Sequence, residues 1–362
     1  MGAEAHPSRN EGGAPGPQYH VRLVFAKKYT GASPPNWSDA EALVFKKILL
    51  SVLMLSITCS SQVLQQMKKT VAFVYGQAHV RDKDGRSVLL DGTLGTAFFV
   101  LYPDPRGGED YGFVYVVTAK HVLKDELEGK YLEKVRLRMN KKDGSGVSFA
   151  TVPVSDNQGN LLWLDDKDDP NADVAATLGH PLEGLVDYLT IPLSLFSSDD
   201  SLKKSNVSEG DSVYLVGLMP QFTGENRNYP VLRHGYIALL SDEPIPIGPN
   251  VKEKVYALEL GSWPGQSGSP VFLSLGGMRG PNLMLGESYS LLGLMLGFVP
   301  NERPFETVGP TNSVLLGDTS NVGISYVLPA SEILKVLDSK EAQQQRDADI
   351  QAKTKNKPTP AH

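Results

Sequence analysis

The chain of 362 residues has little of several features that would place it in a class at once. It has one cysteine, Cys59, which excludes an intrachain disulfide and a cysteine-rich zinc site. Basic residues number 35 against 41 acidic ones, and the two signs are interspersed. The broad basic face that nucleic acid or an anionic membrane would need is therefore absent, and we expect no nucleic-acid partner.

Long hydrophobic runs are also missing. The uncharged stretch Ile48–Thr58 has 11 residues, too few to cross about 30 Å of hydrocarbon, so we expect no integral membrane span. Preceded by Lys46 and Lys47, it matches the apolar region of a signal peptide, and residues 46–60 are interpreted as a signal-peptide-like segment. This predicts an exported protein, periplasmic or secreted. A short buried helix is the alternative.

Residues 1–45 are rich in Pro, Gly and Ala and show no sustained period. We expect either a disordered leader or a mis-assigned start, with translation beginning near Leu43 or Val44. Cys59 follows the apolar stretch directly and could carry a lipid anchor, although Ser56-Ile57-Thr58 lacks the small residue usually found just before such a cysteine. Both alternatives stay open.

Helical periodicity is scarce, and short β-type runs divided by turn signals fill the chain from about residue 70. Hydrophobic (41%) and charged (21%) residues are near globular averages, which excludes disordered, collagen-like and multispan membrane classes. No period of about 20 to 50 residues repeats, which excludes solenoids and propellers. The runs predicted as strands are Val71–Val80, Gly95–Tyr102, Phe113–Ala119, Val135–Met139, Val147–Val154, Val174–Leu178, Ser212–Gly217, Val231–Leu240, Lys254–Leu260, Val271–Leu275, Leu291–Val299 and Val322–Leu328.

Turns and one helix complete the predicted elements. Asp82-Lys83-Asp84-Gly85 and Asp91-Gly92 are predicted as turns. Helical spacing occurs only from Ala330 to about Gln345, with Ser331 as the expected N-cap. The polar residues after it read as a frayed tail, so residues 339–362 are expected to be the helix end and a disordered tail.

Three short segments carry the residue types of acyl-transfer chemistry, and the first contains His121. In Val116–Leu123 a strand of apolar residues runs into a turn that would present this histidine at its end. A histidine in such a place can act as a general base. The plain alternative is a structural histidine at a strand end.

The second segment, Asn171–Leu178, has Asp173 at the mouth of an apolar strand. A partly buried carboxylate needs partners, and orienting an imidazole through its Nδ1–H supplies one. The nearby run Asp165, Asp166, Asp168 and Asp169 is interpreted as a solvated loop. A calcium loop is the alternative, although the EF-hand glycine and closing glutamate are missing.

The third segment is Trp263–Phe272. Gly265 and Gly268 let the backbone take conformations closed to other residues, so the amides of Gly265 and Ser267 can converge as an oxyanion hole. The Oγ of Ser267 would attack beside that hole, with Ser269 as the second choice of nucleophile. A plain Gly/Ser turn is the alternative, and Ser269 excludes the G-x-S-x-G elbow of α/β-hydrolases.

Together the three segments resemble those of the trypsin/chymotrypsin-like serine peptidases. The matching motifs are T-A-x-H ending at His121, D-V-A starting at Asp173 and G-x-S-G-x-P around Ser267, separated by gaps of 52 and 94 positions. Further similar segments are Gly95–Phe98, Gly210–Tyr214 and Gly323–Pro329, so the likeness covers about residues 70–338. Val122, where many animal members have a disulfide cysteine, fits the disulfide-free bacterial type. We expect no PDZ domain after residue 338.

The resemblance implies an all-β protease domain over residues 61–338. It would consist of two packed antiparallel six-stranded β-barrels, about 70–185 and 205–330, with a C-terminal helix. His121 would be the base, Asp173 its orienter and Ser267 the nucleophile, with the backbone amides of Gly265 and Ser267 in the oxyanion hole.

The implied function is peptide-bond hydrolysis through an acyl-enzyme, with a protein or peptide as substrate and no metal or other cofactor. The alternatives are an inactive binding or scaffolding protein with the same fold, and a secreted esterase with the same triad.

The resemblance also places the pocket for the residue before the scissile bond. Gly261, six residues before Ser267, would form its base, and Leu296 and Phe298 would form one wall. These residues offer no charge, so we expect a preference for small-to-medium apolar side chains. Loops could still bring in charged groups, namely Glu225, Arg227, Arg279 or Glu287.

Overall fold

The computed structural model describes residues 62–107, 112–179, 184–248, 251–279, 282–300, 303–306, 315–318 and 321–355. Contacts divide the chain into Met1–Ser51 and Val52–His362, and all described residues belong to the second unit. The expected leader, the signal-like segment and Cys59 lie outside the described residues. Within those ranges no helix is both long and apolar enough to span a bilayer.

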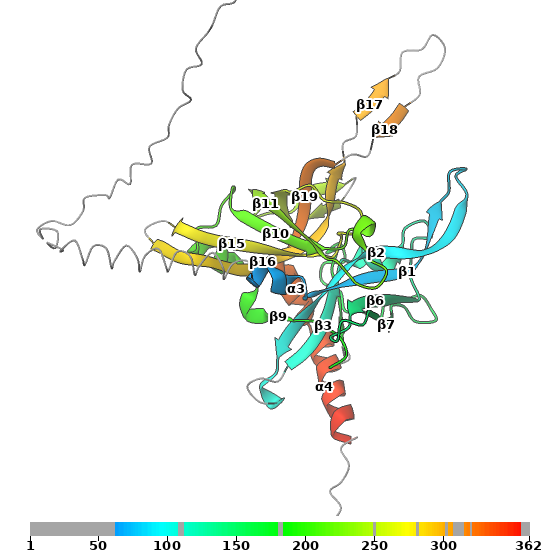
Figure 1. The fold of residues 1–362 in the computed structure, drawn as a ribbon, viewed down its shortest axis with the longest axis horizontal. Coiled ribbons are helices and arrows are strands. Elements are labelled where there is room, and N and C mark those ends of the chain that lie inside the picture. The colour runs from blue at the N-terminus through cyan, green and yellow to red at the C-terminus, as the bar shows by residue number, and fades with distance from the viewer. Residues whose placement is uncertain are drawn as a thin grey trace, which may run out of the picture. The chain divides into compact units, whose positions relative to one another are not determined.

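The first large sheet has the strand order β7-β6-β1-β2-β3-β8, with β9 paired in parallel with β2 (Figure 1). Its edge strands β7 and β8 do not pair with each other in the described part of the chain, so this sheet is an open half-barrel where a closed barrel was expected. The bounds of its strands are β1 (Val71–Arg81), β2 (Ser87–Pro103), β3 (Gly112–Thr118), β6 (Lys134–Asn140), β7 (Val147–Pro153), β8 (Ala175–Leu178) and β9 (Ile191–Pro192).

The second large sheet is the expected closed six-stranded barrel, in the order β10-β11-β14-β19-β16-β15. Side chains alternate along its strands: Val271 and Leu273 on β15 point into the barrel, whereas Phe272 between them joins the neighbouring core. The strands are β10 (Ser212–Gly217), β11 (Val231–Leu240), β14 (Tyr256–Glu259), β15 (Pro270–Arg279), β16 (Asn282–Pro300) and β19 (Asn321–Pro329).

Turns and short elements lie before and between the strands of the two large sheets. The Asp82–Gly85 turn is confirmed, with Gly85 at φ +77°. The turn at Asp91-Gly92 is wrong, because these residues continue β2 and pair with Gln77 and Gly76 of β1. The remaining elements are a helix over 62–67, 3-10 turns at Pro105–Gly107, Lys120–Leu123, Leu193–Leu195 and Pro220–Phe222, α2 (Asp199–Lys204), β4 (Lys124–Asp125), β5 (Lys130–Tyr131), β12 (Ile245–Gly248), β13 (Val251–Glu253), β17 (Arg303–Glu306) and β18 (Leu315–Asp318).

Two helices end the described chain, and they correct the expected tail. Helix α3 (Ala330–Leu337) begins directly after Pro329, so Ser331 lies inside it and is not its N-cap. Helix α4 (Lys340–Lys355) then continues ten residues past Gln345. It is anchored by Arg346, which is 5% exposed, lies 4.0 Å over the Tyr102 ring and donates to Leu337 O. Residues 356–362 lie outside the described residues.

The expected fold class is confirmed. The described chain is a half-barrel and a closed antiparallel β-barrel, with a C-terminal helix, and this strand arrangement fits a chymotrypsin-like fold. The two sheets lie side by side in Figure 1, and buried Thr96 of β2 donates its backbone N–H to Ser267 O at 2.9 Å.

Candidate active site

His121 projects from a buried turn between two sheet strands. Strand β3 ends at Thr118, the chain stays extended at Ala119 and then forms the 3-10 turn Lys120–Leu123. Val122 and Leu123 are buried, whereas the imidazole of His121 is 33% exposed. Packing of the apolar neighbours therefore holds the histidine at the surface of the first sheet, where it can meet a substrate.

Asp173 lies two residues before β8 and holds His121 through both of its carboxylate oxygens. Oδ2 lies 2.5 Å from Nδ1 of the imidazole, and Oδ1 accepts the backbone N–H of His121 at 2.8 Å. With Nδ1–H directed at the carboxylate, Nε2 is left to accept a proton. The structure thus brings together the two residues that the sequence predicted as base and orienter.

The pair shifts the pKa values of both partners. Burial alone would lower the pKa of His121, but the charge and hydrogen bond of Asp173, with smaller contributions from Glu126 and Glu253, raise it above its ordinary value. Burial would raise the pKa of Asp173, yet the charge and hydrogen bonds of His121 lower it. Asp173 therefore stays ionised and stabilises an imidazolium.

Sequence reasoning missed Glu253, which comes from β13 in the second half of the chain. Its Oε1 accepts the backbone N–H of Asp173 at 2.9 Å, and the residue is 3% exposed. Burial, with the charges of Asp173 and Asp169, raises the pKa of Glu253 to about 7. Its sequence neighbours are Lys252 and Lys254, so the local pattern indicates an exposed edge and gives no signal of this contact.

The carboxylates of the aspartate-rich loop before Asp173 form hydrogen bonds and ion pairs with nearby residues. Asp166 Oδ1 accepts the amides of Asp168 and Asp169 at 2.9 and 3.0 Å. Asp165 pairs with Lys167 and lies 3.9 Å from Nζ of Lys120. Within the described ranges no group of three or more His, Cys, Asp or Glu side chains is arranged to hold a metal ion.

The loop that carries Ser267 needs both of its glycines. Gly265 and Gly268 have φ values of +93° and +82°, in the left-handed region. A Cβ at Gly268 would lie 2.1 Å from Thr96 O and 3.1 Å from the backbone N of Ala119. Only glycine therefore lets the serine loop approach the turn that leads to His121.

The backbone amides of the loop alternate between bonded and free. Gln266 N–H donates to Trp263 O and Gly268 N–H donates to Met295 O. Among the described residues, the amides of Gly265 and Ser267 between them have no acceptor. These two are the amides that the sequence predicted for the oxyanion hole.

The hydroxyl of Ser267 is not directed at the histidine. It donates to Leu296 O at 2.8 Å, and no hydrogen bond joins it to His121 in the described structure. A nucleophile in this position has to turn away from Leu296 before it reaches the base. Ser269, the second choice, is fully buried and its Oγ has no partner in the described part of the chain, so substrate cannot reach it.

Thr96 ties the serine loop to the first sheet. Its N–H donates to Ser267 O at 2.9 Å and its Oγ1 donates to Gly265 O at 3.0 Å. The same Oγ1 accepts the N–H of Leu218 at 2.8 Å, and Thr118 Oγ1 donates to Thr96 O at 2.8 Å. One buried residue therefore sets the position of the loop relative to the turn that carries the histidine.

Two of the three predicted pocket residues, Phe298 and Gly261, lie on either side of one residue of strand β19, Ser325. Ser325 pairs with Phe298 on one side, and on the other its hydroxyl donates to Leu260 O at 2.6 Å and contacts Ser262 Oγ at 2.8 Å. Gly261 lies between those last two residues, and buried Leu296 is the acceptor for Ser267.

A charged group that the sequence did not predict lies beside Gly261, the predicted base of the pocket. A Cβ placed there would lie 3.2 Å from Nη2 of Arg233. Arg279, one of the charged residues that loops could have brought in, is paired with Asp211. Arg233 lies just beyond the loops that sequence reasoning considered. Its alternation with buried Gly235 and Ile237 is the signal that would have found it.

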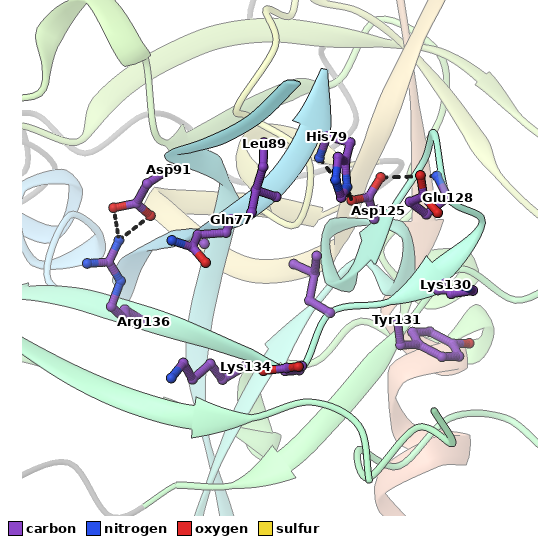
Figure 2. Close-up of a pocket in the computed structure, with 13 residues that line it drawn as sticks. Gln77, His79, Leu89, Asp91, Asp125, Glu128, Lys130, Tyr131, Lys134 and Arg136 are labelled. Atoms are coloured by element: carbon purple, nitrogen blue, oxygen red, sulfur yellow. Dashed lines mark hydrogen bonds and ion pairs between the residues drawn. The ribbon is translucent and has the colours of Figure 1, made fainter. Parts of the chain in front are cut away.

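A second His–Asp pair lies elsewhere on the first sheet (Figure 2). His79 Nδ1 is 2.7 Å from Asp125 Oδ2, beside a cavity of about 620 Å³. Asp125 also accepts the amides of Leu127 and Glu128, which is a turn-capping role. No serine, threonine or cysteine lines this cavity in the described structure, so the pair has no nucleophile to activate.

Comparisons with known proteins find partial likenesses among solved structures. No protein-family model matches the chain, and no curated protein matches it. The crystal structure of Deg5 is 14% identical over 76% of this chain and 90% of that one, with a TM-score of 0.39. An inactive mutant form of Rv3671c from M. tuberculosis H37Rv is 16% identical over 76% and 89%, with a TM-score of 0.38. The fold assignment rests on the strand order described above.

Proposed function

We propose that the protein is a serine endopeptidase, with Ser267 as nucleophile, His121 as base and Asp173 as its orienter. One observation carries the proposal. His121, held by two hydrogen bonds to Asp173, follows the segment against which the serine loop packs at Gly268, and that loop keeps the amides of Gly265 and Ser267 free.

The proposed reaction has two halves. The Oγ of Ser267 forms a bond to the carbonyl carbon of the substrate while its proton passes to Nε2 of His121. The carbonyl oxygen becomes an oxyanion that accepts from the amides of Gly265 and Ser267. The C–N bond then breaks, the amine leaves with the proton from His121, and a water molecule hydrolyses the acyl-enzyme by the same proton route.

The geometry adds one requirement to this scheme. The hydroxyl of Ser267 must exchange its bond to Leu296 O for one to His121 when substrate binds. The raised pKa of His121 means that the base is neutral, and the enzyme active, only at pH above the ordinary value of 6.5.

The test is active-site labelling of the full chain with a fluorophosphonate, followed by mapping of the modified residue. Ser267 should be modified, and Ser267→Ala should lose labelling and on the order of 10⁶ in kcat while it stays folded. Ser269→Ala is the matched control, because Ser269 is buried, and it should still label. Labelling at any other residue, or full activity of Ser267→Ala, would disprove the assignment.

A second candidate is an inactive binding protein with the same fold. The hydrogen bond of Ser267 to Leu296, in place of His121, is the observation that favours it. It predicts no fluorophosphonate labelling and no turnover of peptides or esters. An esterase with the same triad predicts labelling and ester turnover without peptide cleavage, so parallel peptide and ester assays separate the three functions.

We also propose that the protein is exported and belongs to the disulfide-free bacterial type of peptidase. The apolar stretch Ile48–Thr58 after two lysines, the single cysteine and Val122 support this. Digestion of the native exported protein followed by mass spectrometry should recover no peptides from residues 3–28. Abundant recovery of those peptides would argue against removal of the leader.

A further inference from the structure

The side chain of Arg233 points to the inside of the closed barrel, at the end of the barrel where the loop that carries Ser267 begins. It pairs with Leu215 in the β10–β11 register, and Leu215 is fully buried in the barrel core. Its neighbour His234 faces the other way, where it lies 4.9 Å from the ring of Tyr214 and is exposed. Successive side chains of a strand point to opposite faces, so the Arg233 side chain belongs to the inner face.

The guanidinium of Arg233 borders a space at Gly261. The Cβ position there has one heavy atom within 4 Å, Nη2 of Arg233 at 3.2 Å. At Gly268 and Gly293, by contrast, the same position meets backbone atoms at 2.1 and 1.9 Å. No backbone atom outside the chain neighbours therefore blocks the Cβ direction of Gly261, and a cation lies in that direction.

Arg233 has no acid of its own. Within the described residues its guanidinium makes no hydrogen bond or ion pair. Burial lowers its pKa below the ordinary value, the direction expected for a half-buried cation without a nearby carboxylate. Other arginines of the region are engaged: Arg138 donates to two carbonyls of the 220–230 loop, and Arg279 pairs with Asp211.

The same space lies next to the proposed nucleophile. Gly261 precedes Ser262, whose Oγ contacts Ser325 at 2.8 Å, and Ser325 pairs across the sheet with Phe298. Two residues before Phe298, Leu296 holds the hydroxyl of Ser267 at 2.8 Å. The segment at Gly261 and the segment at Leu296–Phe298 therefore flank Ser325 from its two sides, and the second of them contacts Ser267 directly.

We propose that these two segments form the sides of a pocket that binds an acidic side chain, so that the protein cleaves after glutamate or aspartate with Arg233 as the specificity-determining residue. The inference rests on the proposed peptidase function and deepens it. A carboxylate and a guanidinium match in geometry and form paired, charge-assisted hydrogen bonds. An apolar side chain in the same pocket would leave the cation unpaired.

The test uses the full chain and peptide substrates that differ only in the residue before the scissile bond. Glutamate should exceed its uncharged isostere glutamine in kcat/KM by about 10- to 100-fold, the worth of a hydrogen bond between charged groups. Arg233→Gln should remove that ratio, and Arg233→Lys should keep part of it. Arg227→Gln, an exposed arginine of the neighbouring loop, should leave the ratio unchanged.

A binding measurement separates failure of this inference from failure of the proposed function. Peptides that end in glutamate or glutamine are titrated into the Ser267→Ala variant, with and without Arg233→Gln. Equal binding of the two peptides, or cleavage after leucine as fast as after glutamate, would overturn the inference while Ser267 labelling still supports a peptidase. If the glutamate peptide binds more tightly but Ser267 is never labelled, the assignment of the pocket would stand. The proposed catalytic function would then be rejected.

Discussion

Replacing Glu253 by glutamine should stabilise the protein at neutral and alkaline pH. Glu253 is 3% exposed, and its Oε1 accepts the N–H of Asp173, a bond that a glutamine carbonyl can keep. Burial and the charges of Asp173 and Asp169 oppose its ionisation, while Lys120 favours it. Glutamine removes the ionisable group without removing the acceptor, so the variant isolates the cost of burying the charge.

The size of the effect follows from the pKa of Glu253, which rises from its ordinary 4.5 to about 7. Each pH unit of that rise corresponds to about 1.4 kcal/mol, which gives about 3 kcal/mol in total. The pKa of Glu253 is higher in the folded state than in the unfolded state. The protonated group therefore contributes stability that is fully present below pH 4.5 and is lost as the pH rises to about 7. The glutamine variant should escape that loss.

The assay is urea unfolding of both proteins between pH 4 and pH 8.5. The difference in unfolding free energy should move by about 3 kcal/mol in favour of Glu253→Gln across this range. Glu259→Gln, at an exposed position of β14, is the matched control and should show no such trend. Parallel stability curves for wild type and Glu253→Gln would refute the argument from burial.

Three further changes test other parts of the structure. Asp173→Asn should lower kcat about 10⁴-fold. Since Asp173 raises the pKa of His121, the acid limb of the kcat/KM profile should also move from above pH 6.5 to lower pH. An unmoved limb would mean that Asp173 does not control the pKa of the base. Thr96→Val leaves Gly265 O and the Leu218 N–H without their partner, so urea unfolding should show a loss of about 1–3 kcal/mol, accompanied by a fall in kcat. Arg346→Met removes the ring contact with Tyr102 and the bond to Leu337 O, and thermal melting should report a loss of about 2 kcal/mol with kcat unchanged; an unchanged melting temperature would show that α4 is not anchored by this residue.

The sequence was sufficient for features that depend on local pattern. Short runs of β-forming residues between turn signals predicted the strand cores, such as Val271–Leu275 on β15, because strand residues buried on both faces form a continuous apolar run. The positions of Gly265 and Gly268 predicted a loop with special backbone geometry, and both have positive φ. Both kinds of prediction need only neighbouring residues.

Features that depend on distant partners were missed. Asp91-Gly92 has the composition of a turn, yet its pairing with Gln77 and Gly76 makes it strand. Arg346 sits in a polar stretch typical of a frayed tail, and contacts with Tyr102 and Tyr115, more than 200 positions away, keep it helical. Glu253 becomes part of the site only where the folded chain sets it beside Asp173.

Thr96 makes the candidate site sensitive to the spacing of the two sheets. Three of its hydrogen bonds, to Ser267 O, Gly265 O and the N–H of Leu218, converge on one buried residue of β2. A hydrogen bond tolerates only a few tenths of an ångström of stretching. A slight parting of the sheets would release the serine loop while each sheet kept its own ladder. Activity should then be lost on gentle heating or in mild denaturant before the circular dichroism of the protein changes.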